Sequence, residues 1–250
     1  MDAVVAGITW LMDPAHWTGA DGIPTRLLEH LLISAASVVI ACLNAVPIGL
    51  WIGHTGRRAF IAINLANVGR AVPSYAVMAM ILPISLAISP QYGLAVIPTF
   101  LAMTLLAVPP ILVNTYAALR EVDRDLIEAA RGMGMRERQV LRDVEIPIGL
   151  PIIIGGIRTA AVQVVATATL GAVFGYGGLG RYLIDGIARR EFDRLFAGVI
   201  LVAGLALLTE FGIALLQRGL TSAGLRAANA AASPERRLAQ APKGSASPPA

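Results

Sequence analysis

Long apolar runs without a charged residue dominate the pattern of this chain. Residues 30–56 and 71–119 contain no Asp, Glu, Lys or Arg, and residues 159–180 and 195–209 are likewise uncharged. A bilayer core of about 30 Å is crossed by about 20 apolar helical residues. The pattern therefore predicts an all-α, polytopic integral membrane protein. A β-barrel is disfavoured, because its apolar positions would alternate along each strand.

The runs divide into about five predicted spans, with six as the alternative. The five cover residues 28–53, 71–89, 94–118, 147–174 and 195–217. A further short helix at 59–69 is predicted to lie near the interface or to lead into the second span. Pro109 and Pro110 predict a bend in the third span.

Arginine placement orients the predicted spans. Arg57, Arg58, Arg218 and the arginines of residues 120–145 fall on one side, which the positive-inside tendency assigns to the cytoplasm. The N-terminus is then outside and the C-terminus inside. The arginines of residues 181–194 lie outside and oppose this trend, with partial compensation from Asp185, Glu191 and Asp193. The net charge of +4 fits cytoplasmic loops at a membrane without requiring a nucleic-acid partner.

Three regions follow from this topology. Residues 1–26 form an external N-terminal segment, residues 27–218 the transmembrane domain, and residues 219–250, rich in Ala, Ser and Pro, a disordered cytoplasmic tail. Cys42 is the single cysteine and lies in the first span, so no internal disulfide framework is possible.

The main polar interruption lies between the third and fourth predicted spans. Residues 120–145 hold more than a third of the chain's 20 basic and 16 acidic residues. Asp123 or Asp125 can cap a helix there, and Leu126, Ala130 and Met133 share a narrow apolar face. Gly132 and Gly134 permit a sharp turn before a second short helix at 136–144 that leads to Pro147. The pattern favours a folded docking element, with an ordinary solvated loop as the alternative.

The spacing within this segment resembles the EAA loop of the permeases of bacterial ABC importers. Glu128-Ala129-Ala130 is followed after three residues by Gly134, and after nine more by Val144-Glu145-Ile146-Pro147. The family has Ile and Leu at the positions of Val144 and Ile146. We call residues 120–147 the EAA segment. The resemblance implies a type I ABC-importer permease in which this segment couples to an ATPase subunit. The implied coupling residues are Glu128, Ala129, Ala130, Gly132, Gly134 and Pro147.

The resemblance extends from about residue 27 to residue 218 and is strongest to the osmoprotectant subgroup, which moves glycine betaine, carnitine or choline. It rests on "GRAVPS" (69–74), "VPPILVNTYAAL" (108–119), "GIRTAAV" (156–162) and "GAVFGYGGLG" (171–180). It implies transport by alternating access in the bacterial inner membrane. The implied partners are two ATPase subunits, an extracytoplasmic substrate-binding protein, and a second permease copy or a paralogue. Permeases for amino acids such as methionine share "GGLG" and are the alternative.

Polar and aromatic residues within the predicted spans are candidates for the translocation path, because polar groups are costly against lipid. The candidates are Tyr75, Asn114, Arg158, Gln163 and Glu210, with Asn44 and Asn67 as further polar positions. Tyr75, Phe174 and Tyr176 can make cation–π contacts with a quaternary ammonium group, although packing or an interfacial belt is the simpler role. Arg158 and Glu210 are at similar predicted depths, so we expect them either to pair or to face water separately.

Several chemistries find no support in the sequence. "GYGGLG" follows no predicted strand, so it predicts an external turn rather than a phosphate-binding loop. The chain contains no Walker A sequence, which predicts a permease that is not an enzyme. His16, His30 and His54 are far apart in sequence, so we expect interfacial or loop residues rather than a metal site or triad. No cofactor or metal is predicted. An ion-driven secondary transporter is the alternative from a different class, but it would not need the EAA segment.

The topology generates the first testable prediction. With Cys42→Ala as the background, a cysteine introduced at 187 should react with an impermeant thiol reagent in intact cells, whereas one at 125 should react only after lysis. The physical reason is that the membrane separates the two loops. Labelling of 125 but not of 187 in intact cells would invert the assignment.

Overall fold

The described residues are 2–57 and 59–221 of a computed structural model, and they are helical, without a strand. The elements are α1 (Asp2–Met12), η1 (Pro14–Trp17), α2 (Ile23–Thr55), α3 (Ala59–Ala71), α4 (Ser74–Ile88), α5 (Val96–Arg120), α6 (Arg124–Gly132), α7 (Glu137–Gln139), η2 (Val140–Glu145), α8 (Ile146–Thr167), η3 (Ala168–Phe174), α9 (Gly180–Arg189) and α10 (Phe192–Leu220). The predicted disordered tail lies outside the described residues, except that α10 continues through Leu220.

The apolar helices lie where the uncharged runs placed them. Within the described residues, α2, α5, α10 and the continuous run Glu137–Phe174 are long and apolar enough to cross a membrane, and α4 is a shorter apolar helix. The predicted short helix at 59–69 corresponds to α3. The prediction of a polytopic helical membrane protein is therefore confirmed, while the number and direction of its crossings stay predictions.

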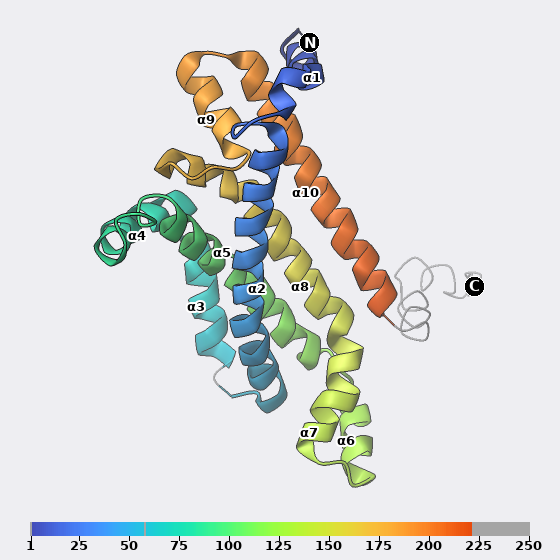
Figure 1. Ribbon diagram of the computed structural model, residues 1–250. Coiled ribbons are helices and arrows are strands. Elements are labelled where there is room, and N and C mark those ends of the chain that lie inside the picture. The colour runs from blue at the N-terminus through green and yellow to red at the C-terminus, as the bar shows by residue number, and fades with distance from the viewer. Residues whose placement is uncertain (1, 58, 222–250) are drawn as a thin grey trace, which may run out of the picture.

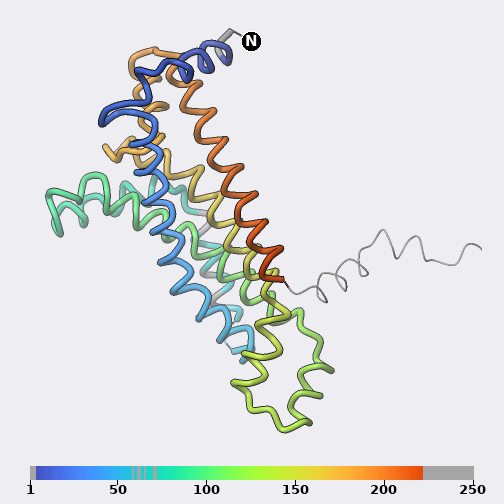
Figure 2. Tube along the Cα trace, turned by 45° about the vertical axis from the view of Figure 1, so that its right-hand side comes forward, coloured from blue at the N-terminus to red at the C-terminus, as the bar shows by residue number. Residues whose placement is uncertain are grey.

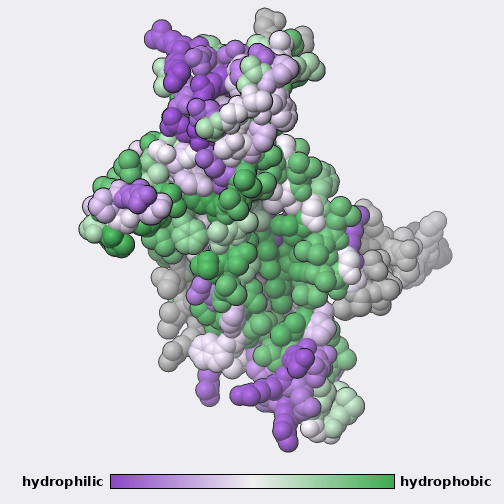
Figure 3. All heavy atoms as spheres, viewed as in Figure 1, coloured by the Kyte–Doolittle hydropathy of each residue, from purple (hydrophilic) through white to green (hydrophobic). Residues whose placement is uncertain are grey.

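The molecule is elongated, with polar residues at its two ends. In Figure 1, α2, α8 and α10 run along its length, α1 and α9 lie at the upper end, and α6 and α7 lie at the lower end. Figure 3 shows an apolar band between two hydrophilic ends. This distribution matches a bilayer solvent, in which the middle of each span contacts hydrocarbon and the ends contact water.

Helix α5 is the centre of the bundle, because small residues let its neighbours approach closely. A Cβ atom at Gly49 of α2 would lie 2.7 Å from Cβ of Thr115, and one at Gly156 of α8 would lie 2.6 Å from Cβ of Asn114. Both distances are too short for real atoms. Small residues at such crossings replace the missing hydrophobic driving force with close van der Waals packing. Glycines of α2 and α8 therefore define where both helices sit against α5.

Helix α10 is the peripheral span. Of the most apolar stretch of α10, 6% is buried inside the chain. The corresponding share for α5 is 56%. Side-chain contacts fasten it to α8: Arg158 Nε lies 3.3 Å from Glu210 Oε1, and Gln217 Nε2 donates to the Pro151 carbonyl at 2.9 Å. At the upper end, α1 packs against α10 (Figure 2). The pairing of Arg158 with Glu210 answers the question that the sequence left open.

The second prediction concerns this ion pair. A double-mutant cycle with Arg158→Ala and Glu210→Ala should give a coupling energy of about 0.6 kcal/mol, and at most about 1.7 kcal/mol, as polar contacts between membrane helices usually do. Each single variant should lose more stability than the pair contributes, because it leaves one charge without its partner. The measurement is unfolding of the purified protein in a denaturing detergent.

A matched control cycle uses Thr159→Ala and Thr209→Ala, next to the ion pair. Each of these hydroxyls donates to a carbonyl of its own helix, Gly155 and Leu205 respectively. This cycle should show no coupling. A coupling energy of zero in the Arg158–Glu210 cycle as well would show that the pair does not hold α10 to α8.

Candidate functional site

The EAA segment is a folded helical unit at the lower end of the molecule. Asp123 is the N-cap of α6, and its side chain accepts a hydrogen bond from the Asp125 backbone N–H at 2.9 Å. Gly134 has a φ of +86°, a left-handed conformation that glycine adopts without strain. The backbone N–H of Met135 donates to the Ala130 carbonyl and closes the turn. The predicted cap and turn are both present in the structure.

Ala129 and Ala130 lie on different faces of α6. The resemblance implied that Ala129 and Ala130 are both ATPase-coupling residues. Ala130 is 2% exposed, and α6 packs against η2 of its own chain. Glu128 and Ala129 are exposed, and the larger apolar residues Leu126 and Met133 are 51% and 78% exposed. The coupling role of Ala130 stays a prediction, and the exposed face of α6, which we call the free face, carries Leu126, Glu128, Ala129 and Met133.

The second helix of the segment also differs from the prediction. A separate helix at 136–144 was expected, but α7, η2 and α8 follow one another without an intervening loop. Val140–Glu145 is a π-helical turn, a feature that often marks functional positions. The exposed Pro147 follows this turn inside the continuous helix, where it has no N–H to donate to the carbonyls of the preceding turn. The EAA segment therefore continues directly into a span.

A cluster of charged side chains joins this segment to the lower end of α2. His54 Nδ1 lies 2.6 Å from Glu145 Oε2, and His54 Nε2 lies 3.3 Å from Glu137 Oε2. Arg131 donates to both carboxylate oxygens of Glu137 at 2.9 Å. This hydrogen-bonded guanidinium lowers the pKa of Glu137. The four residues come from α2, α6, α7 and η2.

A small cavity lies between this cluster and the end of α5. Its volume is about 310 Å³, and its polar lining consists of His54, Arg120, Arg124, Glu128, Arg131 and Glu145. Both signs of charge are present at close range. The cavity therefore belongs to the junction between α2, α5 and α6.

The glycine-rich loop "GYGGLG" is held against the upper end of α2. The Gly178 backbone N–H donates to Glu29 Oε2 at 2.7 Å, and the Tyr176 hydroxyl donates to the Glu29 carbonyl at 2.9 Å. Burial, reinforced by the Glu29 charge, raises the pKa of Tyr176 to about 12, so the hydroxyl remains a donor. A Cβ atom at Gly177 would collide with Glu29 Oε2. The loop is thus a structural turn, as predicted.

One of the three histidines, His30, is not the interfacial or loop residue that was expected from the sequence. His30 is 1% exposed, and its Nε2 is 2.9 Å from the Val165 carbonyl, because α2 begins at Ile23 and its first turns are covered by the loop. His54 lies in the last turn of α2 within the charged cluster. His16 stacks on Trp10 with ring centroids 3.7 Å apart. The three remain far apart.

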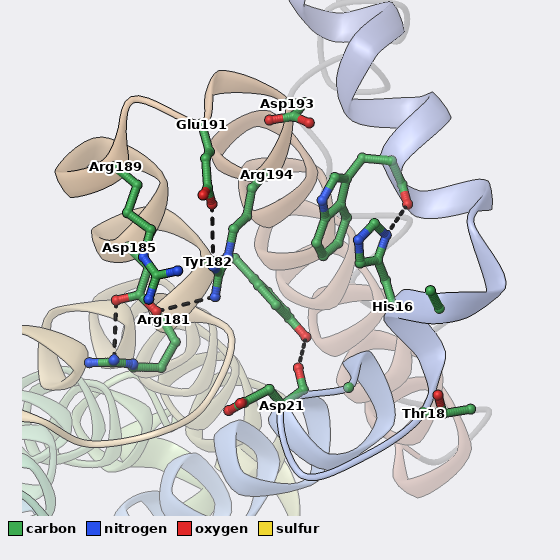
Figure 4. A pocket seen from close by; sticks show the side chains of 13 residues that line it. His16, Thr18, Asp21, Arg181, Tyr182, Asp185, Arg189, Glu191, Asp193 and Arg194 are labelled. Carbon is green, nitrogen blue, oxygen red and sulfur yellow. Dashed lines mark hydrogen bonds and ion pairs between the residues drawn. The ribbon is translucent and has the colours of Figure 1, made fainter.

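A polar pocket of about 520 Å³ opens at the upper end (Figure 4). It lies between the segment around η1 and the α9–α10 corner. Arg194 is its central cation: it contacts Asp185 at 3.2 Å and Glu191 at 3.4 Å, and its guanidinium lies 5.6 Å from the centre of the Tyr182 ring. The Tyr182 hydroxyl donates to the Asp21 carbonyl at 2.7 Å. The Arg194 contacts hold the α9–α10 corner together, and the Tyr182 hydrogen bond fastens the N-terminal segment to α9.

The structure does not join the five path candidates in one network among the described residues. Asn114 donates to the Pro110 carbonyl at 2.8 Å and lies at the contact between α5 and α8. Arg158 and Glu210 pair between α8 and α10. Tyr75 is half exposed, and its ring centroid lies 5.3 Å from that of Phe174. Gln163 on α8 is partly buried. Asn44 and Asn67 are exposed, and Asn44 donates to the Ile40 carbonyl of its own helix.

The pairing of His54 with Glu145 was not predicted from the sequence. Glu145 had a signal, since it is an acidic residue directly before an apolar span. His54 had none, because 91 positions separate the two residues. The role of Glu29 was missed for the same reason.

The fold and this site define a polytopic membrane protein in which a folded polar segment continues directly into the spans. Residues 45–222 match the family described as binding-protein-dependent transport system inner membrane component. The chain therefore belongs to that family. Its members are membrane subunits of ABC transporters, so an ATPase subunit and a substrate-binding protein are its expected partners.

Three relatives illustrate the likeness. The carnitine transport permease protein of Listeria monocytogenes is 36% identical over 91% of this chain and 98% of its own length. The choline transport system permease protein of Bacillus subtilis is 33% identical over 80% and 89%. The osmoprotectant import permease protein of Salmonella typhimurium is 35% identical over 86% and 100%. Each relative is matched over nearly its full length.

The fold is also similar to that of a solved permease. The inward-facing MetNI methionine ABC transporter superposes with a TM-score of 0.68 and 22% identity, covering 80% of this chain and 96% of that chain. At this identity the likeness establishes the fold alone. It agrees with the predicted type I importer architecture.

Proposed function

We propose that this chain is the permease subunit of an ATP-driven importer of osmoprotectants such as glycine betaine, carnitine and choline, in a bacterial inner membrane. The observation that carries the proposal is the identity of 33–36% with permeases for carnitine, choline and osmoprotectants, over most of both chains. Carnitine and choline share a trimethylammonium group. The half-exposed Tyr75 beside Phe174 offers an aromatic surface for such a cation.

The proposed orientation places the N-terminus and the α9 loop outside, and the EAA segment and tail inside. Two permease chains, identical or paralogous, form the path and two ATPase subunits bind the EAA segments. The binding protein delivers solute to the outer end. Closure of the ATPase dimer on ATP moves the EAA segments, and the spans then alternate between outward and inward access.

Reconstitution tests the proposal. The chain should be incorporated into liposomes with its ATPase and binding protein, and uptake of glycine betaine, carnitine, choline and methionine should be compared. Uptake of a quaternary ammonium solute should require ATP and should survive collapse of ion gradients by ionophores, because hydrolysis supplies the work. Methionine-only uptake would establish the amino-acid alternative, and uptake abolished by ionophores with ATP present would establish an ion-coupled carrier.

The free face of α6 generates a further prediction. Ala129→Trp should weaken co-purification of the ATPase by about tenfold or more, because overpacking a fitted contact costs about 1–3 kcal/mol. Glu128→Ala should show a milder loss. Gly134→Val should also weaken association, because it places a β-branched residue at positive φ, at a cost of about 1–3 kcal/mol. Ala130→Trp should instead lower membrane abundance, since Ala130 is buried within the chain.

A control variant keeps this prediction specific. Asp143→Ala removes an exposed acidic residue of η2, away from the free face of α6. It should bind the ATPase normally. Normal association and uptake in Ala129→Trp and Gly134→Val would show that α6 is not the docking element.

A further inference from the structure

The EAA segment is joined to the spans by the chain itself at only two places. Glu121–Asp123 connects it to the end of α5, and η2 connects it to α8. A rigid body held at two points can still rotate about the line through them. A motion imposed on α6 by a partner would then be lost partly in rotation of the segment. A third attachment away from that line removes this freedom.

His54 and its two carboxylate partners supply a third attachment. They join α2, which is distant in sequence from both covalent connections, to Glu145 on η2 and to Glu137 on α7, which lies outside those connections. Both ring nitrogens of His54 face carboxylate oxygens, Nδ1 toward Glu145 and Nε2 toward Glu137. An imidazolium satisfies this geometry, because it has two N–H donors and each meets a carboxylate oxygen. Arg131 extends the contact to α6 through Glu137.

The His54–Glu145 part of this contact is buried, and the Glu137 part is exposed. The Glu145 side chain is 4% exposed and that of His54 is 13% exposed, whereas that of Glu137 is 58% exposed. A buried carboxylate without its partner is strongly unfavourable, so Glu145 holds His54 firmly. An exposed ion pair such as Arg131–Glu137 contributes much less to stability. The π-helical turn that ends at Glu145 sets the direction of this side chain, because it changes the register of the helix there.

Helix α2 can pass on a displacement applied at His54. The preceding residue, Gly53, lies so close to α5 that a Cβ atom there would be 2.9 Å from Cβ of Leu119. Gly49 makes a similar approach one turn earlier. The lower end of α2 is therefore packed tightly against the central helix, and a push at His54 is not absorbed by loose side chains.

We infer that His54 and Glu145 are positioning residues of the transport cycle: their buried contact makes α2 and the EAA segment move as one unit, so that the work of the ATPase reaches α2 as well as α5 and α8. This inference rests on the proposed function. Neither residue touches the solute. Their contribution is to the amount of solute moved for each ATP hydrolysed.

The test compares the coupling ratio, which is the amount of solute moved per ATP hydrolysed, in proteoliposomes that contain the assembled importer. His54→Leu/Glu145→Leu removes the ionic contact without leaving a buried charge, and apolar replacement of a buried pair is often neutral for stability. We expect this variant to bind the ATPase and hydrolyse ATP, while the solute moved per ATP falls by about fivefold or more, the lower limit of typical coupling between sites. Loss of fold stability alone would reduce the amount of complex but not this ratio.

His30→Leu is the matched control, because it removes the other buried histidine of α2, at the opposite end of the helix. Its abundance can fall, but its ratio per assembled complex should equal that of the wild type. A wild-type ratio in the double Leu variant would overturn the inference. Absence of ATP-driven uptake by the wild type would instead refute the proposed function, so the two failures are distinguishable.

A second measurement on the otherwise intact chain covers the case in which the double variant does not assemble. Spin labels at Thr55→Cys on α2 and Asp143→Cys on η2, in a Cys42→Ala background, report the distance across the contact. We expect the distance to differ by less than about 2 Å between the nucleotide-free and ATP-bound complexes, which is the range of a rigid unit. A larger change would show that the two elements separate during the cycle and would overturn the inference.

Discussion

The close approach of α2 and α8 to α5 is the constraint on which the rest of the structure depends. In a bilayer the lipid is as apolar as the side chains, so helices gain little from burying apolar surface against one another. Gly49 and Gly53 on α2, and Gly149 and Gly156 on α8, let their backbones reach the surface of α5. A side chain at any of these positions would push one helix outward. The positions of both ends of the EAA segment follow from this packing, since the segment begins after α5 and ends in α8.

Much of the fold was predictable because the bilayer imposes a simple rule on sequence. Uncharged runs long enough to cross the hydrocarbon identified the apolar helices. The Asp123 cap and the Gly134 turn were also predictable, because both are local: each depends on residues within a few positions. The motif from Glu128 to Pro147 identified the family for a related reason, since its spacing lies within one segment.

The contacts that organise the site were not predictable, because they join residues far apart in the chain. Nothing near His54 indicates Glu145 as its partner, and nothing near Glu29 indicates the glycine-rich loop. Local reasoning also left the surroundings of Ala130 open. Helical periodicity placed it on an apolar face but could not say whether that face meets a partner or η2 of the same chain. The π-helical turn has no sequence signal of comparable strength, although it determines where Glu145 points.

Polar contacts perform different tasks at different depths of the molecule. Within the spans, Arg158 and Glu210 fasten the peripheral α10 to α8, where glycine-mediated packing is sparse. At the upper end, Glu29 and Tyr176 hold the glycine-rich loop against α2, and the hydrogen bond between Tyr182 and Asp21 joins the N-terminal segment to α9.

At the lower end, the two faces of the EAA segment differ. Glu145 and Ala130 on its inner face are buried against the rest of the chain, while Leu126 and Met133 are exposed. Large apolar side chains in water are unfavourable unless a partner covers them. One face of this segment is therefore firmly attached to the helices, and the other exposes apolar side chains to a partner. Such a segment is suited to transmit force, because a partner that covers the exposed face must move the attached helices with it.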